Sequence, residues 1–165
     1  MVNFEASGLL APGFHDCSYN EFYETFVAGF PTSQRRTIIS DSLVAFSAEV
    51  FQIGIPYEFW IDGSYATTKI NPNDADIILF LQYHDYIILG PMLEAFRQKY
   101  QGLLDIYFAC AVSPENEKVI SPKDYSAVIN RRNYWRGQFG FDRQDNPKGI
   151  IRIDCNSVIQ VLQRR

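Results

Sequence analysis

Residues 75–81 read Ala-Asp-Ile-Ile-Leu-Phe-Leu, an almost unbroken run of apolar side chains. Successive side chains of a strand point to opposite faces of a sheet, so a strand with one solvated face alternates apolar and polar residues. A continuous apolar run is instead typical of a strand that is buried on both faces by covering helices. The run therefore predicts a layered fold built around a central sheet.

The remaining segments supply the helices and strands for such a fold, after a turn-rich start at Ala11-Pro12-Gly13. Apolar periodicity and turn residues predict helices over 18–30, 33–52, 86–100 and 122–135 and after residue 153, and strands over 57–62, 75–81, 103–112 and 149–153. Ser33 is the expected N-cap of the second helix. The residues expected to face inward on that helix are Ile38, Leu43, Phe46, Val50 and Phe51. The expected class is α/β (α+β), a mixed sheet of about four strands flanked by helices.

The size and composition favour one folded domain. A chain of 165 residues with 47% hydrophobic content can bury one core and is short for two. No apolar run reaches the roughly 18 residues that span a bilayer, and the start lacks the features of a signal peptide. We expect a single domain over 1–165, cytoplasmic and without a membrane partner.

Few side chains other than carboxylates are available for chemistry. The three cysteines, Cys17, Cys110 and Cys155, are far apart and form no C-x-x-C pair, so we expect buried thiols rather than a disulfide framework or a zinc site. Only His15 and His84 supply imidazoles, which argues against histidine-based metal binding or a Ser-His-Asp triad.

Charge is unevenly distributed along the chain. Residues 1–130 contain seven Lys and Arg against sixteen Asp and Glu, whereas residues 131–165 contain eight against three. The acidic part is where a cation would bind. The basic segment 131–165 is either a solvated surface or a contact for polyphosphate or nucleic acid, and the sequence leaves both open.

Asp74, Asp76 and Asp105 are the strongest candidates for a site. On a strand, Asp74 and Asp76 point the same way, and two close carboxylates favour a hard divalent cation such as Mg²⁺ between them. Asp105 interrupts the next apolar strand near its start. If the two strands are neighbours, Asp105 joins the same site as a third ligand or as the base for an attacking hydroxyl.

Gly63-Ser64 follows the strand predicted over 57–62 and precedes Asp74 by eleven residues. Glycine permits close approach of a ligand to the backbone, and backbone N–H groups at such a junction can hold phosphates. A phosphate loop beside paired carboxylates indicates transfer of a nucleotidyl group, with attack on the α-phosphorus and release of pyrophosphate.

The segments Trp60-Ile61-Asp62-Gly63-Ser64, Asp74-Ala75-Asp76-Ile77-Ile78-Leu79 and Leu104-Asp105-Ile106-Tyr107 together resemble the polymerase-β-like nucleotidyltransferase superfamily over residues 58–108. The chain is most similar to the minimal members of bacterial toxin–antitoxin and antiphage defence modules. The resemblance implies a nucleotidyltransferase-like mixed sheet. It further implies that Asp74, Asp76 and Asp105 bind two Mg²⁺ ions, which Mn²⁺ can replace, and that Gly63 and Ser64 hold the triphosphate.

The chain departs from the family after Gly63-Ser64-Tyr65-Ala66, where the usual Arg-Gly is replaced by Thr67-Thr68-Lys69. Lys69 is a candidate substitute for the missing arginine, as a point charge on the phosphates. Further candidates for triphosphate or acceptor contact are Arg35, Arg36, Arg131, Arg132, Arg136, Lys148 and Arg152. The aromatic residues among them, Tyr134, Trp135, Phe139 and Phe141, suit either the core or base stacking.

The expected function is an active enzyme that transfers NMP or dNMP from a nucleoside triphosphate to a hydroxyl group. The acceptor is a cognate protein (toxin or effector) or a nucleic-acid 3′ end, with template-independent oligonucleotide synthesis as a further form of the reaction. The alternative is a silent antitoxin that neutralises its partner by contact, which the three carboxylates disfavour. A nucleic-acid-binding protein without metal is disfavoured by the pI of about 5.1.

Overall fold

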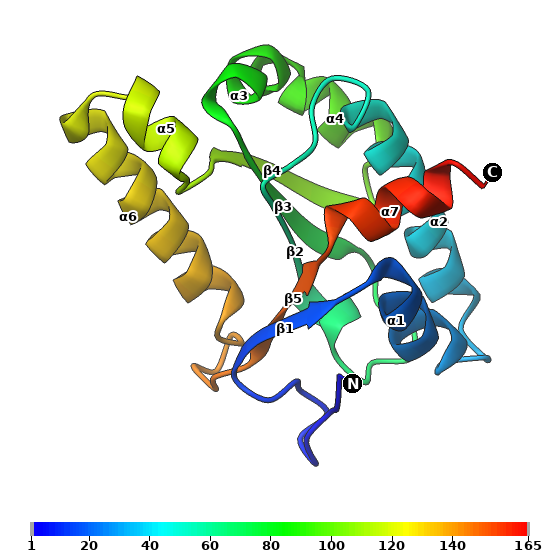
Figure 1. Cartoon of the computed structure of the whole chain (residues 1–165). Helices are drawn as coiled ribbons and strands as arrows, with labels where there is room; N and C mark the ends of the chain where they lie inside the picture. The colour runs from blue at the N-terminus through cyan, green and yellow to red at the C-terminus, as the bar shows by residue number, and fades with distance from the viewer. Residues whose placement is uncertain (1, 165) are drawn as a thin grey trace.

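The computed structural model describes residues 2–164, which form one five-stranded mixed sheet with helices against it (Figure 1). The strand order is β1-β5-β2-β3-β4. The strands are β1 Gly13–Cys17, β2 Glu58–Asp62, β3 Ala75–Leu81, β4 Leu104–Cys110 and β5 Gly149–Ile153. β1 runs parallel to β5 and β4 parallel to β3, whereas β2 is antiparallel to both of its neighbours. The predicted mixed α/β class is confirmed.

Helices cover both faces of this sheet. They are α1 Tyr19–Tyr23, α2 Gln34–Val50, α3 Tyr83–Leu89, α4 Leu93–Lys99, α5 Pro114–Val119, α6 Pro122–Phe139 and α7 Cys155–Leu162. Figure 1 shows α1, α2 and α7 on one side of the sheet and α6 on the other. Strand β3 is buried on both faces as predicted, because Ile77 and Leu79 join the core under α2 while Ile78 and Phe80 join the core under α6.

The sheet has five strands where about four were expected, because β1 was not predicted. The Ala11-Pro12-Gly13 turn leads directly into it. β1 is a short edge strand that contains His15 and Asp16, so it shows no continuous apolar run. Its partner β5 lies at the other end of the chain, and local patterns carry no information about such a pairing.

Helix α2 begins as predicted, because Ser33 caps it by accepting a hydrogen bond from the Arg36 N–H. Ile38, however, was expected to face inward and is 48% exposed, whereas its neighbour Ile39 is buried. The inward stripe follows Ile39, Leu43, Phe46 and Val50, and Ile38 lies one position ahead of it.

Other helix boundaries also differ from expectation. The helix predicted over 18–30 consists of α1 followed by a π-helical turn, Glu24–Ala28. The helix predicted over 86–100 is broken into α3 and α4 by a 3-10 turn, Gly90–Met92, where Pro91 supplies no backbone N–H. α6 continues four residues beyond Trp135 to Phe139, which is its one buried residue. Within residues 2–164, no helix combines the length and apolar character needed to cross a membrane.

Candidate functional site

Three carboxylates lie in a row on one face of the sheet, at the end where β2 stops and β3 and β4 begin. Asp62 is the Cα partner of Asp76, and Asp76 is the Cα partner of Asp105. Side chains at paired positions share a face, so Asp62, Asp76 and Asp105 point to the same side of three adjacent strands. The expectation that the strands carrying Asp76 and Asp105 are neighbours is confirmed.

Asp74 lies one residue before β3, beside this row. With Asp105 it lines a cavity of about 300 Å³ whose other wall comes from α4, and its negative charge contributes to the raised pKa of Asp76. The structure thus brings together the three carboxylates predicted from the sequence and adds Asp62 to them.

Asp76 is held in an environment that resists ionisation. Burial raises its pKa to about 6, and the negative charges of Asp105 and Asp74 act in the same direction. Lys148 and Arg143 oppose this shift only in part. A cation between these carboxylates would remove the repulsion, because it favours the charged form of each.

Gly63 allows the carboxylate of Asp76 to lie directly against the backbone. The residue begins a 3-10 turn, Gly63–Ala66, immediately after β2, and has a φ of 76°. A Cβ at this position would overlap Asp76 Oδ2. Gly63 therefore lies against the carboxylate row, and Ser64 is half-buried in the same turn.

Asp62 forms a buried ion pair with Lys148, which lies at the start of β5. Lys148 Nζ donates to Asp62 Oδ2 at 2.7 Å, while Asp62 Oδ1 is buried and has no hydrogen-bond partner within the described residues. Burial raises the pKa of Asp62 to about 7 even though Lys148 lowers it. The pair therefore places one positive charge, that of Lys148, against the Asp62 end of the carboxylate row.

Tyr107 restrains Asp105 from the same strand. The two residues are two apart and share a face, and Tyr107 Oη donates to Asp105 Oδ2 at 2.6 Å. Burial and this bond raise the pKa of Tyr107, so its hydroxyl stays a donor. Asp105 retains its other carboxylate oxygen for a ligand.

Arg36 does not serve the triphosphate role suggested by the sequence. Its side chain is fully buried and donates to the carbonyl oxygens of Phe26, Tyr65, Thr67 and Lys69. These bonds fix the backbone that follows the Gly63 turn. Arg36 is therefore part of the scaffold beneath the loop.

Lys69 and Arg35 are two further basic candidates near the loop that leads into β3. The side chain of Lys69 is exposed, and the contacts that the structure gives this residue are made by its backbone, with Thr67 and Arg36. Arg35 donates to the carbonyl oxygens of Asn73 and Gly102, which ties together the turns before β3 and β4.

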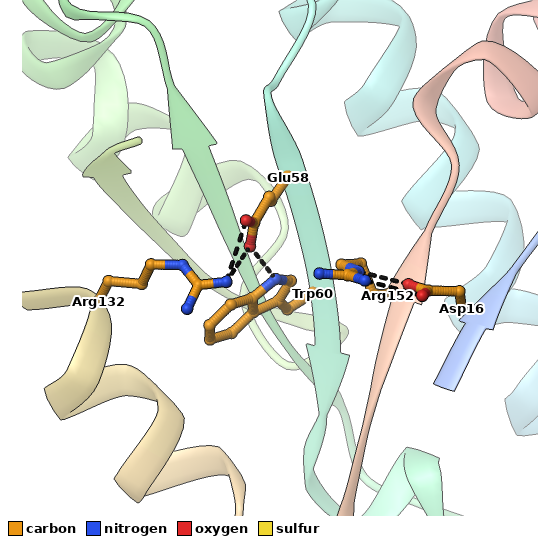
Figure 2. A network of polar contacts seen from close by, with 5 residues as sticks. All are labelled: Asp16, Glu58, Trp60, Arg132 and Arg152. Carbon is orange, nitrogen blue, oxygen red and sulfur yellow. Dashed lines mark hydrogen bonds and ion pairs between the residues drawn. The ribbon is translucent and has the colours of Figure 1, made fainter. Parts of the chain in front are cut away.

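Two further basic candidates are engaged at the opposite end of the sheet (Figure 2). Arg132 of α6 pairs with Glu58 at 3.0 Å and its guanidinium lies 5.0 Å from the ring of Trp60, which itself donates to Glu58. Arg152 pairs with Asp16. These ion pairs attach α6 and β1 to the sheet, so Arg132 and Arg152 are structural rather than phosphate ligands.

A cavity of about 600 Å³ lies at that opposite end and is lined by Asp16, Glu58 and Arg152 among others. It contains none of the carboxylates of the row.

A metal at the carboxylate row would need ligands in addition to the protein side chains. Within residues 2–164, no group of three or more His, Cys, Asp or Glu side chains is arranged to hold an ion by itself. Mg²⁺ commonly uses one or two carboxylates and completes its shell with water and substrate phosphates. The oxygens of Asp76 and Asp105 are donors of this kind, and their mutual repulsion favours a cation.

Asp62 and Tyr107 were missed as members of the site, and Lys148 was expected in another role. Asp62 carried a signal, since it ends an apolar strand directly before Gly63-Ser64 in the same phase as Trp60. Lys148 was a candidate for triphosphate or acceptor contact, but its side chain pairs with Asp62, a partner distant in sequence. Tyr107 was visible only as a residue two positions from Asp105.

Comparisons with curated proteins and with solved structures find no match. Residues 2–154, nearly the whole chain and all of the carboxylate row, match a family whose function is unknown. The family match therefore assigns no function to the chain. The chain belongs to the DUF6932 family of unknown function.

Proposed function

We propose that the protein is a metal-dependent nucleotidyltransferase that moves a nucleoside monophosphate from a nucleoside triphosphate to a hydroxyl group. The observation that carries this proposal is the pairing of Asp76 with Asp105 across neighbouring strands, with Asp76 lying against Gly63. This close approach puts the Gly63 turn beside the carboxylates, and we assign phosphate binding to the backbone N–H groups of the turn and to the Ser64 hydroxyl. Phosphate and divalent metal are the ligands that such neighbours suit together.

The proposed step is an in-line displacement. The acceptor oxygen forms a bond to the α-phosphorus while the bond from that phosphorus to the bridging oxygen breaks, and pyrophosphate leaves with the bonding electron pair. The acceptor proton passes to Asp105, whose free carboxylate oxygen is available while Tyr107 holds the other. Gly63 and Ser64 hold the triphosphate by backbone and hydroxyl donors.

Mg²⁺ held by Asp74 and Asp76 would neutralise the phosphates and make the acceptor hydroxyl more acidic, while Asp105 accepts the proton. The chain contributes the arrangement around it. Lys148 balances part of the negative charge through Asp62, and Arg36 keeps the loop after Gly63 in place. The proposed acceptors are a hydroxyl of a partner protein or the 3′ end of a nucleic acid.

The test is incorporation of label from each α-labelled NTP and dNTP, with Mg²⁺ or Mn²⁺, into protein, RNA, DNA or a new small product. We expect transfer by the native chain and its loss in Asp76→Asn and Asp105→Asn. Glu117→Gln, which removes an exposed carboxylate on α5, serves as the matched control and should keep full activity. Label transfer that persists in Asp76→Asn would rule the proposed site out.

A silent binding protein is the second candidate, because the described carboxylates do not by themselves form a three-ligand metal group. It predicts no turnover with any nucleotide, and a partner-neutralising effect that Asp76→Asn retains. Co-expression of the native or Asp76→Asn chain with the protein encoded beside it separates the two candidates.

A further inference from the structure

A second cavity, of about 330 Å³, lies along the free edge of the sheet between β4 and α6. Its α6 wall comes from residues spaced three or four apart on one side of the helix: Asp124, Ala127, Val128, Arg131 and Trp135. Tyr107 and Ala109 of β4 lie opposite, and α4 contributes Arg97. We call this cavity the α6–β4 cleft. Its volume falls in the range of roughly 300–1,000 Å³ typical of small-molecule sites.

The cleft exists because α6 packs loosely against the sheet. Of its 18 residues, Phe139 alone is buried, and Trp135 is only half-buried. The strand opposite presents the small side chain of Ala109. A helix used purely as a cover would bury an apolar stripe along its length, which α6 does not do.

Aromatic rings and arginines line the cleft together. The ring centroids of Tyr107 and Trp135 lie 4.4 Å apart with their planes tilted by 49°, and we call these two rings the aromatic wall of the cleft. The Arg97 guanidinium lies 5.0 Å from the Tyr107 ring and is held there because its Nε donates to the Ile106 carbonyl oxygen at 2.8 Å. Arg131 lines the same cleft and forms no ion pair within the described residues. Aromatic rings beside arginine form the chemistry that binds bases and phosphates.

The α6–β4 cleft is connected to the carboxylate row through two residues. Arg97 also lines the smaller cavity that contains Asp74 and Asp105. Tyr107, part of the aromatic wall, donates through its hydroxyl to Asp105. A ligand whose base lies on the aromatic wall would therefore bring its phosphates past Arg97 toward the carboxylates.

We propose that the α6–β4 cleft binds the base of a nucleotide by stacking on Tyr107 and Trp135, with Arg97 and Arg131 as partners of its phosphates. The inference rests on the proposed function in that it names where one substrate of the transfer would bind. The nucleotide is either the free triphosphate or the terminal nucleotide of a nucleic-acid acceptor. Both present the same base and phosphate to the cleft.

The chain contains a built-in reporter for this proposal. Of its two tryptophans, Trp60 is fully buried and Trp135 is half-buried in the cleft. Titration of the native chain in EDTA with each NTP, and separately with short oligonucleotides, should quench tryptophan fluorescence with saturation. The arm that saturates at lower concentration identifies the source of the nucleotide. Because metal is absent, this signal is independent of catalysis.

Variants then assign the binding to the cleft. Trp135→Ala should weaken nucleotide affinity, measured by calorimetry, by roughly tenfold or more, as expected for loss of one stacking partner. Arg131→Gln should weaken it and reduce its salt dependence. The matched controls are Tyr83→Ala, an exposed aromatic on α3, and Lys123→Gln, an exposed basic residue on α6, neither of which lines the cleft. Trp135→Phe keeps a ring and should restore most of the affinity.

Equal affinity in the native chain, Trp135→Ala and Arg131→Gln would overturn the proposal, as would the absence of any nucleotide binding to the native chain. Circular dichroism tests whether each variant is folded. If Trp135→Ala does not fold, the affinity of Arg131→Gln decides whether the cleft binds the nucleotide. If nucleotide binding depends on Trp135 but no label is transferred, the proposed function is refuted and the proposal that the cleft binds a nucleotide stands. Label transfer with a KM unchanged in Trp135→Ala and Arg131→Gln refutes the cleft and leaves the function.

Discussion

At the scale of single residues, Gly63 and Gly102 offer a matched pair of substitutions. Both have a φ of 76°, but a Cβ at Gly63 would overlap Asp76 Oδ2 whereas a Cβ at Gly102 meets nothing within 4 Å. Gly102→Ala should therefore cost only the backbone strain, about 1 kcal/mol. Gly63→Ala should cost about 1–3 kcal/mol more and should also weaken Mg·NTP binding, since Asp76 must move.

Urea unfolding of both variants, with calorimetric titration of Mg·NTP, measures the difference. Equal losses of stability in Gly63→Ala and Gly102→Ala would mean that the approach of Asp76 to the loop is not a structural constraint.

The buried pair of Asp62 and Lys148 gives a second prediction at this scale. Lys148→Met leaves Asp62 buried without its countercharge, which should lower the free energy of unfolding by about 3 kcal/mol at pH 7. The loss should be smaller at pH 5, where the proton that neutralises Asp62 is more readily bound. The double variant Asp62→Asn/Lys148→Met should regain much of the stability, and urea unfolding of all three chains at both pH values tests this. A double variant no more stable than Lys148→Met would contradict it.

At the scale of elements, Arg36 joins α2 to the loop that follows the Gly63 turn. Its guanidinium satisfies the carbonyl oxygens of four residues and is completely buried. Arg36→Met would leave those oxygens without donors, so we expect a loss of at least about 3 kcal/mol. Arg35→Met, one residue earlier and only half-buried, should cost about 1 kcal/mol or less. Chemical denaturation compares the two, and similar costs would show that burial of Arg36 is not what matters.

The elements that the sequence predicted well are those with a strong local pattern. β3 was found with its bounds because both of its faces are buried, and α2 because Ser33 marks its start. β1 was missed because its pairing with β5 joins the two ends of the chain. α5, a single short helix after β4, was also not predicted, since six residues are too few to establish a period.

The residues of the candidate site that the sequence predicted are likewise those with a strong local pattern. Asp74, Asp76 and Asp105 were predicted because each interrupts or borders an apolar strand, and parallel pairing then brings Asp76 and Asp105 together. The roles of Arg36 and Lys148 depend on partners far away in sequence. Whether an arginine contacts phosphate or supports a loop is decided by tertiary packing, which charge alone does not reveal.

At the scale of the whole molecule, polar side chains divide between the two ends of one sheet face. The Asp76 end carries adjacent carboxylates whose repulsion is only partly balanced, whereas the Glu58 end carries closed ion pairs with Arg132 and, nearby, Asp16 with Arg152 (Figure 2). The closed pairs attach helix and edge strand to the sheet. The unbalanced end is where a cation would increase the stability of the fold.

This imbalance predicts how the stability of the protein depends on pH. The pKa of Asp76 is raised to about 6 in the folded state, against an ordinary value near 4 when unfolded. Between these values the folded chain holds a proton that the unfolded chain has lost. The free energy of unfolding should therefore fall as pH rises from about 4 to about 6, by up to about 3 kcal/mol from this residue. Urea unfolding across this range measures the slope, which Asp76→Asn should reduce and Glu117→Gln should leave unchanged. Asp62, whose pKa is raised to about 7, should keep the slope from vanishing in Asp76→Asn.

A divalent metal ion should raise the free energy of unfolding, because it binds the ionised carboxylates that otherwise repel one another. At a Mg²⁺ or Mn²⁺ concentration ten times the dissociation constant, the native chain should gain about 1.4 kcal/mol of stability. The gain should be large at pH 7.5 and small at pH 5, where Asp76 is mostly protonated. Thermal melts with and without metal at both pH values, repeated for Asp76→Asn and Glu117→Gln, make the comparison. A gain that is equal at both pH values, or that Asp76→Asn retains, would place the ion elsewhere on the protein and would separate the carboxylate row from the proposed chemistry.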